Sequence, residues 1–172
     1  MKLVFRYPKD NSDLNVLLAV KAYESIWLQD GQRILERFKY YTGLDFQQDE
    51  IEVTAHNSQS MSGMDGVPMR LNTANTTLPA QRNALVHELG HRLLFGNGIT
   101  VDDENEEEIR VYLFQGDTLR DLYGEETYHH WASIDPAWHT EEHIIYIKNV
   151  TSLSAEQRKR KIKLFADKAV KG

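Results

Sequence analysis

The sequence predicts an α+β fold in which a small mixed sheet packs on a long helix and on a second helix, followed by a mostly helical C-terminal part. Three short segments alternate apolar and polar residues, as half-buried strands do. Two longer segments repeat their apolar residues every three or four positions, as amphipathic helices do. A length of 172 residues suits one domain, 1–172. We expect it to comprise an N-terminal subdomain over 1–96 and a C-terminal part over 99–172.

The three expected strands are short. Residues 1–7 alternate and are closed by Pro8, and residues 50–56 alternate in the same way. Residues 67–72 form the third expected strand. Pro68 places this strand at an edge of the sheet, because proline cannot donate a ladder hydrogen bond.

Two helices are expected to pack on this sheet. The first covers 13–41, with a pause in its pattern at Gly31 and an end at Gly43. The second covers 79–95. Its start and stop signals are Thr77, Pro79, Gly96 and Gly98.

The C-terminal part begins with another helix. Asp102 or Asp103 can cap it, Glu106 closes a capping box with Asp103, and the pattern runs to about Tyr123. Beyond it, the sequence predicts an irregular segment over 124–138, a short strand over 143–148 and a helix over 154–170 that opens with a second capping box.

The second helix carries the most informative motif of the chain, His87-Glu88-Leu89-Gly90-His91, an H-E-x-x-H arrangement. Residues four apart project from one face of a helix, so both imidazoles can bind one zinc ion. Glu88 then stands beside the remaining coordination position as a general base for a zinc-activated water. Alternatively, the three are ordinary helix residues satisfied by hydrogen bonds, but desolvating them without a metal is costly.

A catalytic zinc needs a third protein ligand, and the chain contains no cysteine. Glu108 is the preferred candidate, because it borders the apolar face of the helix after the motif, whereas Glu106 and Glu107 point more toward solvent. Three other acids remain as alternatives: Glu104, Asp102 and Asp103.

The composition limits the setting and the partners. The absence of cysteine excludes disulfides and a cysteine nucleophile, and no apolar run reaches the roughly 20 residues of a membrane span. Without a signal peptide, a cytoplasmic protein is expected. A net charge of −6 argues against nucleic acid as the partner. The basic run at 158–163 is expected to be a solvated helix face, with nucleic-acid binding as the alternative.

On its motif, its order of elements and the segment that begins at Glu108, the chain resembles the zincin metallopeptidases. Within them it looks like the gluzincins, whose third ligand is a glutamate on the next helix, including thermolysin-like and small phage-regulator-cleaving enzymes. This resemblance implies one Zn²⁺ per chain and a peptide or protein substrate. Arg92 departs from the uncharged residue usual after the second histidine. A metzincin would need Gly and His where Leu94 and Asn97 stand.

Two further expectations concern catalysis. The resemblance implies a downstream donor to the oxyanion, for which the candidates are Tyr128, His129, His130, His139 and His143. An extended substrate is expected to pair with the edge strand at Met69, Arg70, Leu71 and Asn72. The competing hypothesis is a catalytically silent or latent metal-binding module, in which the residues after Gly124 plug the cleft. The sequence does not predict the oligomeric state.

Overall fold

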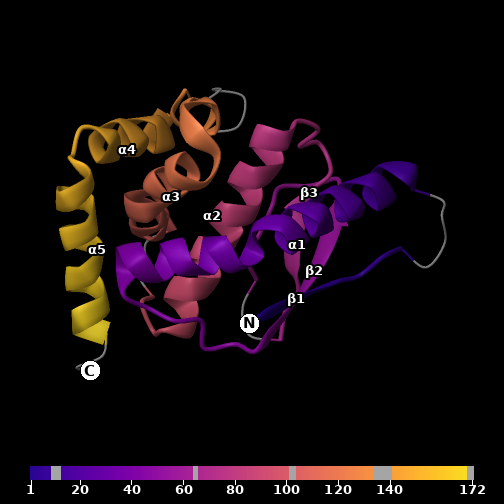
Figure 1. The fold of residues 1–172 in the computed structure, drawn as a ribbon, viewed down its shortest axis with the longest axis horizontal. Helices are drawn as coiled ribbons and strands as arrows, with labels where there is room; N and C mark the ends of the chain where they lie inside the picture. The colour runs from indigo at the N-terminus through magenta and orange to yellow at the C-terminus, as the bar shows by residue number, and fades with distance from the viewer. Residues whose placement is uncertain (9–12, 64–65, 101–103, 134–140, 170–172) are drawn as a thin grey trace.

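The computed structural model describes residues 1–8, 13–63, 66–100, 104–133 and 141–169. Within these ranges the chain forms a three-stranded sheet and five helices (Figure 1). No described helix is long and apolar enough to cross a membrane. The elements are β1 (Lys2–Phe5), α1 (Leu14–Thr42), β2 (Glu50–His56), β3 (Met69–Asn72), α2 (Leu78–Gly96), α3 (Glu104–Ala132), α4 (Glu141–Thr151) and α5 (Ala155–Ala169).

The sheet has the order β1-β2-β3, and both strand pairs are parallel. The expected α+β class is therefore confirmed, but the expected mixed sheet is wrong for the named strands. Antiparallel pairing in the described chain is limited to an isolated bridge between Met61 and Arg70. Parallel pairing follows from the connections, because α1 and the segment 57–68 are both long enough to carry the chain back to the starting end of the sheet.

Helix α1 runs without interruption through the expected pause. Asp13 caps its start by accepting hydrogen bonds from two backbone N–H groups, and Gly43 ends it in the left-handed region at φ 79°. At Gly31 the indole of Trp27 lies on the helix surface, where a Cβ atom would come within 2.8 Å of the ring. The glycine therefore makes room for Trp27, while the helix continues.

Helix α3 contains a kink at Gly124, where φ is 80° and ψ is −174°. The expected helix end near Tyr123 coincides with this kink. The expected irregular segment is partly wrong, because the chain is helical again up to Ala132. The expected strand at 143–148 is wrong, because these residues lie in α4, where Ile147 and Val150 are buried at helical spacing.

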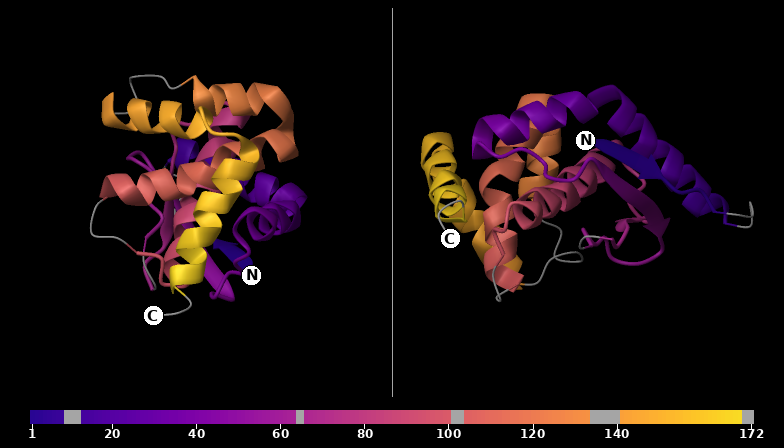
Figure 2. Two further views of the ribbon diagram at one scale, coloured as in Figure 1. Left: turned by 90° about the vertical axis from the view of Figure 1, so that its left-hand side faces the viewer. Right: turned by 90° about the horizontal axis from the view of Figure 1, so that it is seen from below.

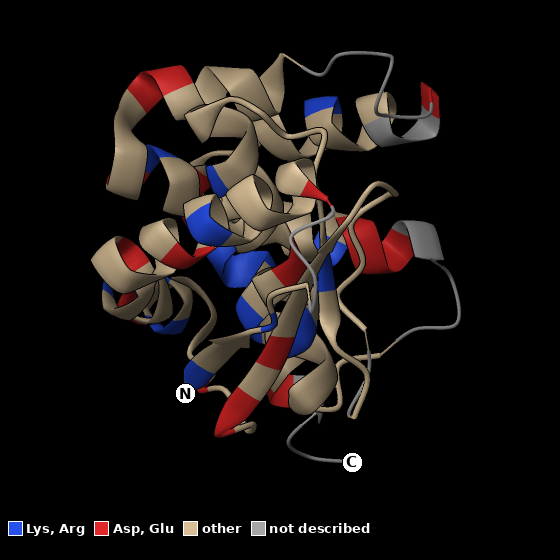
Figure 3. Cartoon of the chain, turned by 90° about the vertical axis from the view of Figure 1, so that its right-hand side faces the viewer, with Lys and Arg blue, Asp and Glu red and all other residues tan. Residues whose placement is uncertain are grey.

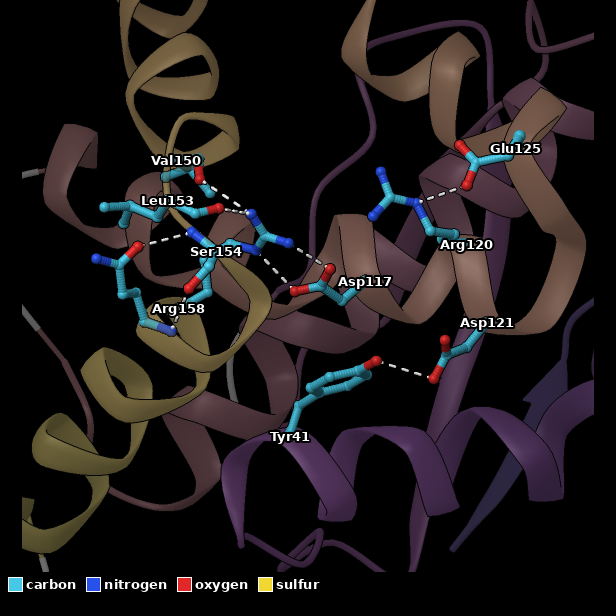
Figure 4. Close-up of polar contacts among 10 residues, drawn as sticks. Tyr41, Asp117, Arg120, Asp121, Glu125, Val150, Leu153, Ser154 and Arg158 are labelled. Carbon is cyan, nitrogen blue, oxygen red and sulfur yellow. Dashed lines mark hydrogen bonds and ion pairs between the residues drawn. The ribbon is translucent and has the colours of Figure 1, made fainter.

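Helix α5 packs against α1 and α3 at the end of the molecule opposite the sheet (Figures 1 and 2). Its expected capping box forms between Ser154 and Gln157. The first member of the basic run, Arg158, is buried rather than solvated, and its guanidinium binds Asp117 of α3 at 2.5 and 2.7 Å (Figure 4). Tyr41 of α1 donates to Asp121 of α3 at 2.8 Å, so polar contacts join all three helices (Figure 4).

Candidate metal centre

The H-E-x-x-H motif lies in the middle of α2, which begins where the sequence predicts. Thr77 caps the helix by accepting from a backbone N–H, and Asn97 follows its last residue. His87 and His91 are one turn apart, and their Nε2 atoms are 3.1 Å from each other. The helix therefore presents two imidazole nitrogens to one point in space.

Helix α3 packs along α2 and brings Glu108 to both histidines. Its Oε2 atom is 3.3 Å from His87 Nε2, and its Oε1 atom is 3.2 Å from His91 Nε2. These three side chains form the group in the described chain that could hold a metal ion. The side chain of Glu104, and all of Asp102 and Asp103, lie outside the described residues.

The dimensions of this group suit zinc. Ligand atoms bonded tetrahedrally to zinc at about 2.0–2.2 Å stand roughly 3.3–3.6 Å apart. The observed separations of 3.1, 3.2 and 3.3 Å fall at or just below that range, with His91 facing Oε1 and His87 facing Oε2 of Glu108. Two imidazole nitrogens and one carboxylate oxygen also make up a donor set of catalytic zinc sites, in which the fourth position stays open.

Gly90, inside the motif, allows this close approach of the two helices. A Cβ atom on Gly90 would lie 2.8 Å from Cγ1 of Val111 and 3.3 Å from the ring of Phe114, both on α3. Any side chain at this position would push α3 away from α2. The position of Glu108 beside the histidines therefore depends on glycine at residue 90.

The Nδ1 atom of each histidine, which faces away from the cluster, also has a hydrogen-bond partner. His87 Nδ1 donates to Gln115 Oε1 at 3.1 Å, and His91 Nδ1 donates to Glu107 Oε1 at 2.9 Å. Asn83 fixes the orientation of the Gln115 amide, because its Oδ1 accepts from Gln115 Nε2 at 2.7 Å. Such contacts set the histidine tautomer and leave Nε2 available for a metal.

The sequence interpretation missed both of these partners. The sequence predicts that Glu107 points toward solvent, yet its carboxylate reaches His91. Figure 3 shows, in red, neighbouring acidic residues on one helix. Gln115 follows Glu108 by seven positions, which is two helical turns on the same face. That spacing is the signal that could have identified it.

No protein-family model, no curated protein and no solved structure matches the chain. The chemistry of the site must therefore be inferred from its donor atoms and from the groups around them.

The charges of the cluster are strongly coupled. Burial lowers the pKa of His91, but hydrogen bonds to Glu107 and Glu108 outweigh burial and raise this pKa to about 10. Burial likewise lowers the pKa of His87, and Glu108 raises it overall. Burial raises the pKa of Glu108, but the two histidines hold it well below its usual value. Without a metal, the raised pKa of His91 keeps a proton on its imidazole at neutral pH.

Glu88 lies beside this cluster and is only 5% exposed. Burial raises the pKa of its carboxyl group, the two histidines lower it, and Glu108 and Glu107 raise it further, so the net direction is upward. The described residues place no hydrogen-bond donor on this carboxylate. A carboxylate with a raised pKa next to a metal site has the properties of a general base.

Tyr112 is a further residue at the site, which the sequence indicated only as part of an apolar face. It is buried, and its ring centroid is 5.8 Å from that of His87. Burial and the Glu108 carboxylate both raise the pKa of the phenol. Tyr112 therefore stays protonated and can stabilise the Glu108 carboxylate by hydrogen bonding.

The structure places none of the described candidates for the oxyanion donor, Tyr128, His129 and His130, in contact with the cluster. The Tyr128 ring packs on Trp131 and lies 3.6 Å from the Arg120 guanidinium carbon, whereas His129 and His130 are exposed. The whole of His139 and the side chain of His143 lie outside the described residues. Tyr112 lies nearer the cluster, with its ring centroid 5.8 Å from that of His87.

The strand expected to pair with substrate already has partners along its outer edge. Arg70 exchanges two backbone hydrogen bonds of 2.9 Å with Met61. The backbone N–H of Asn72 donates to the Ser60 hydroxyl, and its carbonyl accepts from Tyr23. Substrate pairing with Met69, Arg70, Leu71 and Asn72 stays a prediction, but the backbone groups of Arg70 and Asn72 already have partners within the chain.

Proposed function

We propose that the protein is a zinc-dependent metallopeptidase. The observation that carries the proposal is the cluster of His87, His91 and Glu108, with donor atoms 3.1–3.3 Å apart, beside the buried carboxylate of Glu88. A third ligand on the helix after the motif is the gluzincin arrangement, which supports the same conclusion. The sheet and the first two helices follow the element order expected for a zincin N-terminal subdomain.

Each residue has a distinct role in the proposed reaction. His87, His91 and Glu108 would hold the metal, which when bound lowers the pKa of water and polarises a carbonyl group. Glu88 accepts the proton of the attacking water and passes it to the leaving amine. Gln115 and Glu107 keep the two imidazoles in the tautomer that exposes Nε2.

Metal content and peptide cleavage, measured together, test the proposal. We expect near one zinc per chain in the wild type and in Glu88→Gln, and little zinc in His91→Ala and Glu108→Ala. Peptide cleavage should fall by about 10²–10⁴-fold in Glu88→Gln, the range typical for losing a general base. A wild type that binds no zinc after zinc addition would overturn the proposal.

The second candidate is a latent or catalytically silent metal-binding module. Two observations favour it: Glu88 and His91 are 5% and 6% exposed, and the outer edge of β3 is already paired. Zinc at one ion per chain, with no cleavage of unfolded proteins by the full chain, would support this module. If truncation after Gly124 released activity in a folded, zinc-loaded protein, latency rather than silence would follow.

A further inference from the structure

A cavity of about 400 Å³ lies between α3, α4 and α5. Both α4 and α5 pack against α3, and they diverge from the turn that joins them (Figures 1 and 2). The walls between them are mainly apolar and include Ile109, Leu113, Val150, Leu153 and Phe165. Sites for small molecules typically have volumes of about 300–1,000 Å³, so this cavity is at the lower end of that range.

The lining of the cavity changes from its floor to its mouth. Leu113 and Val150 are 2% and 3% exposed and form the floor. Asn149 and Lys161 also line the cavity, but they are exposed and therefore mark its mouth. Of the described residues that line the cavity, Lys161 alone carries a charge. The cavity thus combines an apolar interior with a single cation at its entrance.

The ammonium group of Lys161 is available to an anion, in contrast to the nearby guanidinium group of Arg110. Arg110 lies with its guanidinium carbon 4.5 Å from the ring centroid of Phe165, and its Nη2 is 3.4 Å from Glu106 Oε2. Arg110 therefore supports one wall and already has a carboxylate partner. Within the described residues, Lys161 forms no ion pair.

An apolar space of this size is not what close packing alone produces. Protein interiors pack densely, and side chains around an unfilled space lose the contacts that a neighbour would supply. Water compensates poorly here, because an ordered water needs several polar partners and the floor of the cavity offers apolar side chains. An alkyl chain would supply the missing contacts and leave the water at the same time.

We propose that this cavity binds a free medium-chain fatty acid, with its alkyl chain in the apolar interior and its carboxylate at Lys161. The amide of Asn149 supplies a further donor at the mouth. The small volume favours a medium chain over a long one. Ile109 and Leu113 are four positions apart on one face of α3, whereas Glu108 points from another face to the histidines. The inference therefore does not rest on the proposed peptidase function.

Calorimetric titration of the full chain with decanoate, below its critical micelle concentration, tests the inference. Across hexanoate, octanoate and decanoate, the affinity should rise about fourfold for each methylene buried. Lys161→Gln should weaken decanoate binding about two- to fivefold, as expected for an exposed ion pair, and leave the weaker binding of uncharged 1-decanol unchanged. Lys163→Gln is the matched control, because Lys163 is exposed on the same helix but does not line the cavity.

Asn149→Trp provides a second, independent variant, because a large side chain at the mouth should block entry without disturbing the core. Decanoate affinity should fall more than about tenfold, whereas Lys148→Trp, at the neighbouring exposed position outside the lining, should keep it. Absent decanoate binding in the wild type, or full binding in Asn149→Trp, would overturn the site. Equal affinities of the wild type for decanoate and 1-decanol would overturn the role of Lys161. Neither readout involves zinc or cleavage, so either failure would leave the peptidase proposal untouched.

Discussion

Two buried groups of charges lie along α3, and they are neutralised in different ways. Near the middle of the helix, Asp117 faces Arg158, whose guanidinium also donates to the carbonyls of Val150 and Leu153. The pair carries no net charge, and the hydrogen-bonding groups of Arg158 are engaged. This part of the molecule therefore has no need of a ligand.

The start of α3 contrasts with this pair. Three carboxylates, those of Glu88, Glu107 and Glu108, surround the imidazoles of His87 and His91. Even with both imidazoles protonated, the charges sum to −1. The two Nε2 atoms approach to 3.1 Å, which is close enough for both to bind one cation. Asp117 with Arg158 is a completed ion pair, whereas the cluster with His91 keeps a net negative charge that the proposed metal would balance.

The largest expected effect comes from breaking the completed pair. Asp117→Ala leaves the buried Arg158 without its counter-charge, and we expect a loss of about 3–5 kcal/mol in the free energy of unfolding. Denaturant titration measures this loss, and zinc content should stay near one ion per chain. The double variant Asp117→Leu with Arg158→Met should recover most of the stability, because hydrophobic replacement of a buried pair is often neutral. A double variant as unstable as the single one would contradict this account.

Removing the metal should produce the next largest effect. A zinc concentration 100-fold above Kd stabilises the folded protein by about 2.7 kcal/mol. A chelator should therefore lower the Tm of the wild type, and thermal unfolding with and without chelator measures the shift. His91→Ala should show no shift, whereas Asp117→Ala should show the full shift from its lower starting Tm. An equal chelator effect in His91→Ala would place the zinc elsewhere.

Changing a partner of the cluster should have a smaller effect. Glu107→Gln removes the carboxylate that His91 Nδ1 contacts at 2.9 Å. We expect about 10- to 100-fold weaker zinc binding, as is typical for the outer contacts of metal ligands. Competition with a fluorescent zinc indicator measures the change. Glu106→Gln, one residue earlier and exposed, is the control and should leave the affinity within a factor of about two of the wild type.

The pH dependence of the zinc affinity should be the smallest of the four effects. With a pKa of about 10 in the metal-free protein, His91 is protonated at neutral pH. Zinc requires the unprotonated nitrogen, so binding releases this proton and the affinity rises with pH until the pKa is passed. We expect up to about a tenfold gain per pH unit for each proton released. Calorimetry in two buffers of different ionisation enthalpy counts the protons, and a pH-independent affinity would contradict the assignment.

The elements that the sequence predicted well are those with strong local signals. Asp13, Thr77 and Ser154 cap helices at the predicted starts, and Gly43 ends α1 as expected. The sequence favours Glu108 because it borders an apolar face, and the packing of that face brings its carboxylate within 3.3 Å of His87. Where a residue and its neighbours in sequence decide the structure, the prediction succeeds.

The features that the sequence did not predict depend on distant partners. The short apolar run around Ile147 suits a strand or a helix equally well, and only packing against α3 decides for the helix. The direction of β3 depends on the path of the segment 57–68. Likewise, Gln115 contacts His87, which is 28 positions away, and Arg92 contacts Ser62, which is 30 positions away. Local periodicity carries no information about such pairs.

The glycine inside the motif makes the metal centre sensitive to a single methyl group. Gly90→Ala would press on Val111 and widen the gap that Glu108 must span, without touching any ligand. Zinc affinity should then fall as the two helices move apart. A second substitution that shortens the facing side chain, Val111→Ala, should restore the affinity. The sizes of the side chains at positions 90 and 111 thus set the distance between α2 and α3. Uncharged substitutions at these two positions are therefore expected to weaken or restore zinc affinity.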